Sequence, residues 1–118
     1  MTALDLARRY HEGWTSGDYE QAIALLAPGL EVEVPINDYP TRVAFGQALR
    51  GFGEVVDRVE LLSELGSGDE AVLLYDMRVQ GLGELRVAEH FTVAGGRITR
   101  LRQIHDTAPV REWLSGAR

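Results

Sequence analysis

The chain has 118 residues, 12 Lys and Arg against 18 Asp and Glu for a formal net charge of −6, and no cysteine. The acidic balance argues against a nucleic-acid partner, because binding to phosphates requires clustered basic side chains. The lack of cysteine excludes disulfides, thiolate zinc sites and a cysteine nucleophile. We expect a single domain over residues 1–118, with room for a core and one small cavity.

The N-terminal segment MTALDLARRYHEGW is predicted to be a helix, because apolar residues from Ala3 to Trp14 recur at helical spacing. Ser16-Gly17-Asp18 is expected to end this helix. The segment has no apolar run of the length that a signal peptide or a membrane span needs. A cytoplasmic protein without a membrane partner is therefore expected.

Two more helices and one strand are predicted before residue 53. Asp18 is a candidate N-cap for a helix over residues 19–28, which Pro28-Gly29 would end. The segment LEVEVPI, residues 30–36, alternates between apolar and polar residues and predicts a strand. After the turn sequence NDYP, Thr41 is expected to cap a helix over residues 42–52.

The second half of the chain predicts an antiparallel sheet. Strands are expected over residues 58–65, 71–79, 84–93 and 97–106, separated by the turn sequences GSGD, QGLG and AGG. The last stretch, residues 108–118, is expected to form one or two helical turns. Helices followed by hairpin strands favour an α+β domain, with the helices against one face of a curved sheet.

A glutamate interrupts the apolar face of one predicted strand. In LRVAEHFTV, strand alternation puts Glu89 on the same side as Leu85, Val87 and Phe91. A carboxyl group in apolar surroundings has its ionised form disfavoured, so it could donate a proton near neutral pH. Three simpler interpretations remain open, in which a bulge shifts the alternation of the strand, Glu89 lies at a rim, or Glu89 pairs with an arginine.

The inward faces of the strands and of the first helix would enclose a small apolar chamber. Such a chamber with a few polar groups is the usual form of a small-molecule site. The polar residues of the inward face are Glu89, Gln103 and His105. Its apolar lining is predicted to be Tyr10, Trp14, Val32, Val34, Leu61, Tyr75, Met77, Val87, Phe91 and Leu101.

The order of these elements resembles the nuclear transport factor 2-like superfamily over about residues 4 to 108. The segment AEHFTVAGGRIT, together with the S-G-D step after the first helix and V-E-V-P at the end of the first strand, carries the resemblance. Within the superfamily the chain is similar to the SnoaL-like polyketide cyclases and the ketosteroid isomerases. The resemblance implies a cone: a bent antiparallel sheet wrapped on N-terminal helices, with an internal apolar pocket.

The resemblance also implies roles for two residues. Tyr10 matches the tyrosine with which ketosteroid isomerases donate a hydrogen bond to the developing enolate oxygen. Glu89, in the E-H-F segment, matches their protonated aspartic acid in the same oxyanion hole, a pairing known from those enzymes. The longer glutamate side chain would shift the carboxyl group, which matters for catalytic geometry.

The third catalytic position departs from the ketosteroid isomerases. Their proton-shuttling aspartate in V-E-D-P is replaced by Val34, and valine cannot accept a proton. Strand alternation turns Glu33 to the opposite face. Asp38, in the following turn, and His105 are the candidates left to move a proton.

The limonene-type epoxide hydrolases share the cone but need an Asp-Arg-Asp arrangement. Asp76 could match one carboxylate, yet Leu74 and Gln103 stand where the arginine and the second aspartate would be. This reaction is disfavoured. The three histidines form no metal-binding motif, and no metal or cofactor is expected.

Two functions follow from these residues. The first is an isomerase or cyclase for a small hydrophobic molecule, with Tyr10 and Glu89 stabilising an oxyanion and with Asp38 or His105 handling the proton. The second is a non-catalytic binding or dimerisation module that lacks the base at Val34. Either way, members of this superfamily commonly form homodimers through the outer sheet face, where we expect Val72, Leu74, Asp76, Ile98, Arg100, Arg102 and Ile104.

Overall fold

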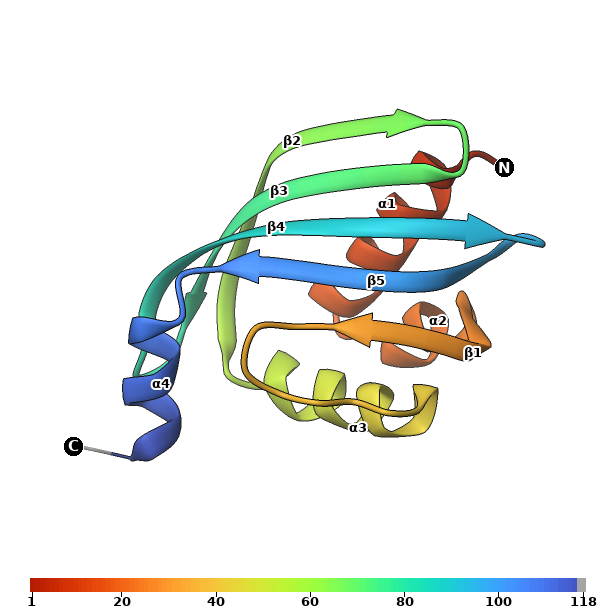
Figure 1. Ribbon diagram of the computed structural model, residues 1–118. Coiled ribbons are helices and arrows are strands. Elements are labelled where there is room, and N and C mark those ends of the chain that lie inside the picture. Colours follow the sequence, from red (N-terminus) through yellow and green to blue (C-terminus); the bar gives the residue numbers. More distant parts are fainter. Residues whose placement is uncertain (117–118) are drawn as a thin grey trace.

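The computed structural model describes residues 1–116, which contain a five-stranded sheet. Figure 1 shows this sheet curling around the first helix. The strand order across the sheet is β1-β5-β4-β3-β2. Four helices flank this sheet within the described residues. In chain order the elements are α1 (Ala3–Thr15), α2 (Tyr19–Ala24), β1 (Leu26–Glu33), α3 (Arg42–Gly53), β2 (Val56–Ser67), β3 (Glu70–Val79), β4 (Gly83–Ala94), β5 (Arg97–His105) and α4 (Ala108–Ser115).

Side chains at three helix starts satisfy backbone N–H groups. At α1, the Thr2 hydroxyl accepts a bond from the Asp5 N–H, and the Asp5 carboxylate accepts one from the Thr2 N–H, both at 3.1 Å. Such a reciprocal pair fixes the first turn. Asp18 and Thr41 cap α2 and α3 in the predicted way, through bonds from the N–H groups of Gln21 and Ala44.

The prediction for residues 19–28 was wrong at its C-terminal end. Helix α2 ends at Ala24, and β1 begins at Leu26 rather than at residue 30. The Leu25 carbonyl accepts a 2.8 Å bond from the Ile98 N–H, and Leu26 pairs with Ile98. Pairing with a strand from the other end of the chain therefore overrides the local helical pattern. Strand β1 ends at Glu33, so Pro35 lies outside it.

The α+β cone is confirmed, with one feature that the sequence did not predict. Strands β2 to β5 pair in antiparallel order, but β1 runs parallel to β5. Glu31 lies opposite Arg100 in this parallel pair, and their side chains form an ion pair at 3.2 Å. The sheet is thus mixed rather than purely antiparallel.

Ile98 was predicted on the outer face, and this is wrong. In β5, Ile98 pairs with Val93 while Arg100 pairs with Thr92, so Thr99 is an extra residue in the ladder. A bulge of this kind reverses the facing of the residues that follow. Ile98 and Leu101 therefore both point inward, and both are fully buried.

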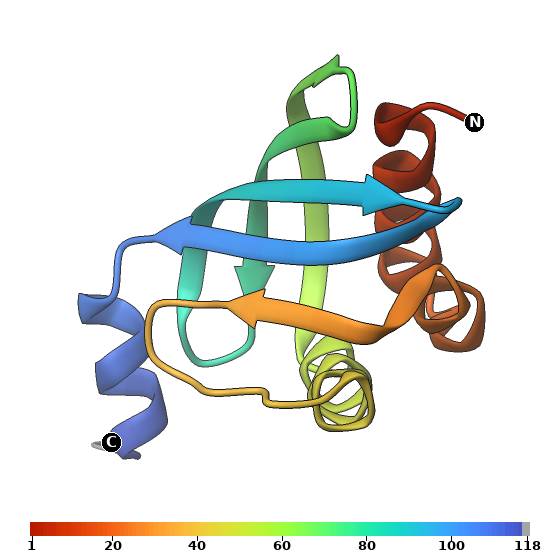
Figure 2. The same cartoon turned by 45° about the vertical axis from the view of Figure 1, so that its right-hand side comes forward.

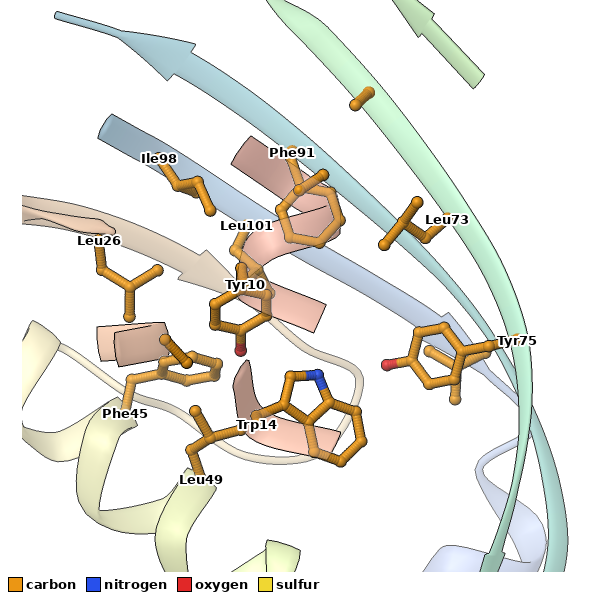
Figure 3. Packing of buried hydrophobic residues seen from close by; sticks show 14 of the residues in the cluster. Tyr10, Trp14, Leu26, Phe45, Leu49, Leu73, Tyr75, Phe91, Ile98 and Leu101 are labelled. Atoms are coloured by element: carbon orange, nitrogen blue, oxygen red, sulfur yellow. The ribbon is translucent and has the colours of Figure 1, made fainter. Parts of the chain in front are cut away.

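The core lies between α1 and the concave face of the sheet, as Figures 2 and 3 show. The Tyr10 ring meets the edge of Phe91 at a centroid distance of 5.7 Å. Leu26, Leu73, Ile98 and Leu101 complete this packed end of the cone. Each such side chain contributes roughly 1.5 to 3 kcal/mol when it is buried.

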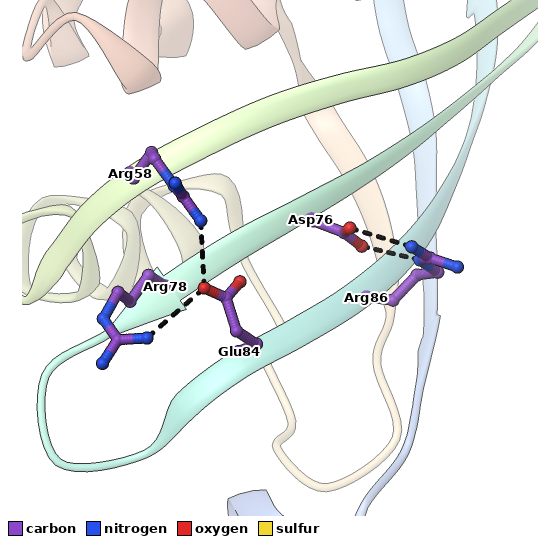
Figure 4. Close-up of polar contacts among 5 residues, drawn as sticks. All are labelled: Arg58, Asp76, Arg78, Glu84 and Arg86. Carbon is purple, nitrogen blue, oxygen red and sulfur yellow. Dashed lines mark hydrogen bonds and ion pairs between the residues drawn. The ribbon is translucent and has the colours of Figure 1, made fainter.

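The outer face of the sheet carries ion pairs instead (Figure 4). Arg86 on β4 donates two bonds to the Asp76 carboxylate on β3, at 2.6 and 2.9 Å. Glu84 accepts from Arg58 at 3.1 Å and from Arg78 at 3.4 Å. These pairs are exposed, so they contribute little to stability. The bonds from Arg86 do show that the Asp76 carboxylate lies on the outer face of the sheet and not inside the cone.

Over residues 1–116, none of the helices has the length and apolar character needed to cross a membrane.

Candidate functional site

A cavity of about 130 Å³ lies at the end of the cone away from the packed core, between α1, α3, α4 and the sheet. Helix α1 contributes Tyr10 and Trp14 to its wall. Helix α3 contributes Phe45, Leu49 and Phe52. A cavity of about 150 Å³ is known to hold a benzene molecule, so this space fits one ring.

Glu89 is the charged residue at the centre of this wall. Its side chain is 1% exposed. The Tyr75 hydroxyl donates to its Oε1 atom at 3.1 Å, and the Gln103 Nε2 group donates to its Oε2 atom at 2.8 Å. Burial raises the pKa of Glu89 to about 7, although the bonds from Gln103 and Tyr75 act in the opposite direction. The carboxyl group can therefore be either neutral or ionised near neutral pH.

The strand register explains why these three residues meet. Gln103 on β5 is the direct cross-strand partner of Glu89 on β4. Tyr75 on β3 pairs with Val87, so it lies diagonally across from Glu89 on the same inward face. The prediction that Glu89 faces inward is correct, and a rim position or an arginine partner is excluded for it.

Tyr10 and Trp14 face the cavity with their polar groups unpaired. The Tyr10 side chain is 1% exposed and the Trp14 side chain 4%. Within the described part of the chain, neither the Tyr10 hydroxyl nor the Trp14 indole N–H makes a hydrogen bond, yet neither atom is sealed off by protein atoms. Burial and the nearby Glu89 raise the pKa of Tyr10 well above its ordinary value. Tyr10 therefore stays a donor.

His105 lines the cavity beside Gln103 and has a fixed orientation. Its Nδ1 atom lies 2.9 Å from the Asp106 carbonyl oxygen. Because a carbonyl only accepts, the proton of the neutral imidazole is on Nδ1. The Nε2 lone pair is then free to accept a proton. The structure thus brings Tyr10, Glu89 and His105 to one cavity.

Three other predicted site residues lie elsewhere. Asp38 is exposed in the loop between β1 and α3 and does not line the cavity. Phe91 and Leu101 face inward as predicted, but they are fully buried in the packed end of the cone, behind Tyr10. Trp14, Val34, Tyr75, Met77, Val87 and Gln103 line the cavity as predicted. Val32 and Leu61 were also predicted to line it and do not, and Leu61 is 39% exposed.

The mouth of the cavity was not predicted. Trp113 on α4 donates from its indole nitrogen to the Gln80 carbonyl at 2.9 Å, in the turn between β3 and β4. Its ring meets the edge of Phe52 at a centroid distance of 6.2 Å. Asn37 and Tyr39, from the loop after β1, complete the mouth. The apolar spacing of Val110 and Trp113 signalled the helix but not the surface that it covers.

No metal-binding cluster of three His, Asp or Glu side chains is found between residues 1 and 116. The polar groups of the cavity are one carboxyl, the amides of Gln103 and Asn37, one imidazole and a set of hydroxyl and indole donors. Such groups can hold an uncharged molecule and move a proton.

Solved structures share this fold closely. A protein from Kribbella flavida DSM 17836 has 32% sequence identity and a TM-score of 0.90, over 98% of this chain and 96% of that chain. An NTF2-like protein from Burkholderia thailandensis E264 has 21% identity and a TM-score of 0.80, over 97% and 98%. A putative ketosteroid isomerase from Kribbella flavida has 20% identity and a TM-score of 0.79, over 90% and 78%. No curated protein matches the chain.

The curved, open five-stranded sheet with N-terminal helices on its concave face is the NTF2-like cone fold. The family model of the SnoaL-like domain matches residues 7–101. The chain belongs to the SnoaL-like domain family.

Proposed function

We propose that this protein binds a small hydrophobic molecule in the cavity, and that Glu89 donates a proton or a hydrogen bond to that molecule. One observation carries the proposal. Glu89 is a carboxyl group buried in an apolar wall, with a pKa of about 7, and it is held at both oxygens by Tyr75 and Gln103. Catalytic acids and bases commonly have perturbed pKa values of this kind.

The reaction that fits these groups is proton transfer next to a carbonyl. Neutral Glu89 and Tyr10 would donate to an oxygen that becomes negative as a neighbouring C–H proton leaves. His105 Nε2 would accept that proton. The name of one structural neighbour, a putative ketosteroid isomerase, points to the same class of chemistry.

Binding of phenols with graded acidity tests the oxyanion part of this proposal. Single-ring phenols mimic an enolate and match the cavity volume of about 130 Å³. We expect affinity to rise as the phenol becomes more acidic, and the rise to weaken in Glu89→Gln and Tyr10→Phe. If both variants bind the phenols with the same affinities as the wild type, Glu89 and Tyr10 do not have the assigned role.

A binding module without catalysis is the second candidate. Val34 lines the cavity, and it stands at the position of the missing base. Exchange of the α-protons of cyclohexanone in D2O separates the two functions. Exchange that depends on His105 supports an enzyme. Binding of cyclohexanone without protein-dependent exchange supports the module.

A further inference from the structure

We infer that Trp14 is a second ligand-binding donor, and that its indole N–H and the Tyr10 hydroxyl together hold one oxygen acceptor of an uncharged, one-ring ligand. This inference rests on the proposed function and names the class of ligand. Trp14 was predicted to be a wall residue only. Its indole N–H makes no hydrogen bond within residues 1–116 and is open to the cavity, which gives Trp14 a polar role as well.

Helix geometry brings the two donors together. Tyr10 and Trp14 are four residues apart on α1, so they lie on one face of the helix, one turn apart. Both line the cavity. Figure 3 shows the Tyr10 hydroxyl pointing down from its ring, and the indole nitrogen of Trp14 on the edge of its ring nearer to the hydroxyls of Tyr10 and Tyr75. Because neither donor has a protein acceptor within residues 1–116 and neither is sealed off by protein atoms, both are available to a ligand oxygen in the cavity.

The charged side chains that line the cavity determine whether it can hold a charged ligand. No Lys or Arg lines the cavity within residues 1–116, so no permanent positive charge is available to balance an anion. Glu89 faces the same space, and its ionised form would repel an anion. A neutral carbonyl fits, because it accepts from two donors without bringing a charge. The volume of about 130 Å³ limits the ligand to one ring inside the cavity.

Cyclohexanone and methylenecyclohexane are matched probes for this site. They have the same shape, but only the ketone can accept a hydrogen bond. Trp14→Phe and Tyr10→Phe should each weaken ketone binding roughly threefold to tenfold, the loss that one hydrogen bond represents. Neither substitution should weaken hydrocarbon binding to that extent. Equal losses for both probes would mean that Trp14 acts through packing alone, and would overturn the inference.

Infrared spectroscopy of the bound ketone gives a readout that packing does not mimic. Each donor lowers the carbonyl stretching frequency, so the frequency should rise when either donor is removed. Replacing Trp14 by 3-benzothienylalanine, which has sulfur in place of the N–H, keeps the shape of the ring. The same replacement at Trp113 is the control, because that indole N–H is bonded to Gln80. An unchanged frequency in the Trp14 analogue would overturn the inference.

The outcomes for cyclohexanone and for phenols distinguish the role of Trp14 from ligand binding in the cavity. If cyclohexanone binds but its carbonyl stretching frequency is the same in the wild type and in the Trp14 analogue, the inference is wrong. Ligand binding in the cavity is then still supported. If phenols bind and cyclohexanone does not, a neutral acceptor is the wrong ligand class. If neither binds, the proposed function and the inference both fall.

Discussion

The Tyr75 hydroxyl donates a 3.1 Å hydrogen bond to Glu89 Oε1, and both side chains are almost wholly buried. Gln103 holds the other carboxyl oxygen at 2.8 Å. Burial favours the neutral acid, whereas both bonds favour the carboxylate. The balance between burial and two neighbours therefore sets the proton affinity of Glu89.

Removing either donor should raise the pKa of Glu89 above its value of about 7. Gln103→Leu is expected to raise the pKa more than Tyr75→Phe, because the Gln103 bond has the larger effect. Each change should also lower the free energy of unfolding by about 1 kcal/mol, as for a typical lost hydrogen bond. Titration of the Glu89 carboxyl ¹³C resonance measures the pKa. A lowered pKa in either variant would contradict this assignment.

Glu89 should make the protein less stable as pH rises. Its pKa goes from an ordinary value of 4.5 to about 7 on folding, so the folded state binds more protons between these values. Stability from this group is full at low pH, is lost as pH rises through this window, and changes by about 3 kcal/mol in total. Glu89→Gln should abolish this component, which urea unfolding across the window measures.

His11 should act in the opposite direction. It is 6% exposed on α1, beside the rings of Trp14 and Tyr75, and its Nδ1 atom has no hydrogen-bond partner among the described residues. Burial lowers its pKa from 6.5 to about 4, although Glu64 opposes the shift. The unfolded state then binds more protons between these values, so stability rises with pH by about 3 kcal/mol. His11→Phe should remove this rise.

The two effects overlap in pH and nearly cancel. The contribution of these two groups to the free energy of unfolding of the wild type should therefore change little between about pH 5 and 6.5. Glu89→Gln should expose the rise due to His11, and His11→Phe should expose the fall due to Glu89. The double variant is the control and should lose both slopes. Identical profiles for both single variants would contradict the assignments.

Elements with local signals were predictable from the sequence. The N-caps Asp18 and Thr41 and the inward face of Glu89 depend on residues close in the chain, and the structure confirms them. The end of α2 depends on pairing between β1 and β5, which are far apart in sequence. The facing of Ile98 depends on the bulge at Thr99 in the pairing of β5 with β4. A bulge inserts one extra residue into a strand. The alternation of apolar and polar residues in the sequence does not show at which position this happens.

The same limit of prediction from strand alternation applies to the residues of the cavity. Alternation predicted that Tyr75 and Phe91 share the inward face, but not which end of the cone each occupies. Cross-strand register puts Tyr75 beside Glu89, whereas Phe91 packs against Tyr10 in the core. The donor role of Tyr75 was missed because it depends on this register.

The outer sheet face remains our proposed homodimer surface. Leu74, Ala88 and Ile104 are successive cross-strand neighbours on β3, β4 and β5, and Ile104 is 72% exposed. A two-fold axis would bury this row against its copy. Ile104→Glu should weaken the dimer at least about tenfold, because a carboxylate would be buried twice. Sedimentation equilibrium measures the change.

Val43 offers a matched control for this experiment. It is also highly exposed, but it lies on α3, away from the sheet face. Val43→Glu should leave the association state as it is in the wild type. A wild-type protein that sediments as a monomer would rule out the dimer.

The position of α4 at the cavity mouth determines where a tag can be attached for these experiments. Trp113, through its bond to Gln80 and its contact with Phe52, joins this helix to the turn and to the helix on either side of the opening. The N-terminus lies at the far end of the molecule (Figure 1). An affinity tag or a surface tether is therefore best placed before Met1, because α4 carries Val110, Trp113 and Leu114 of the cavity wall.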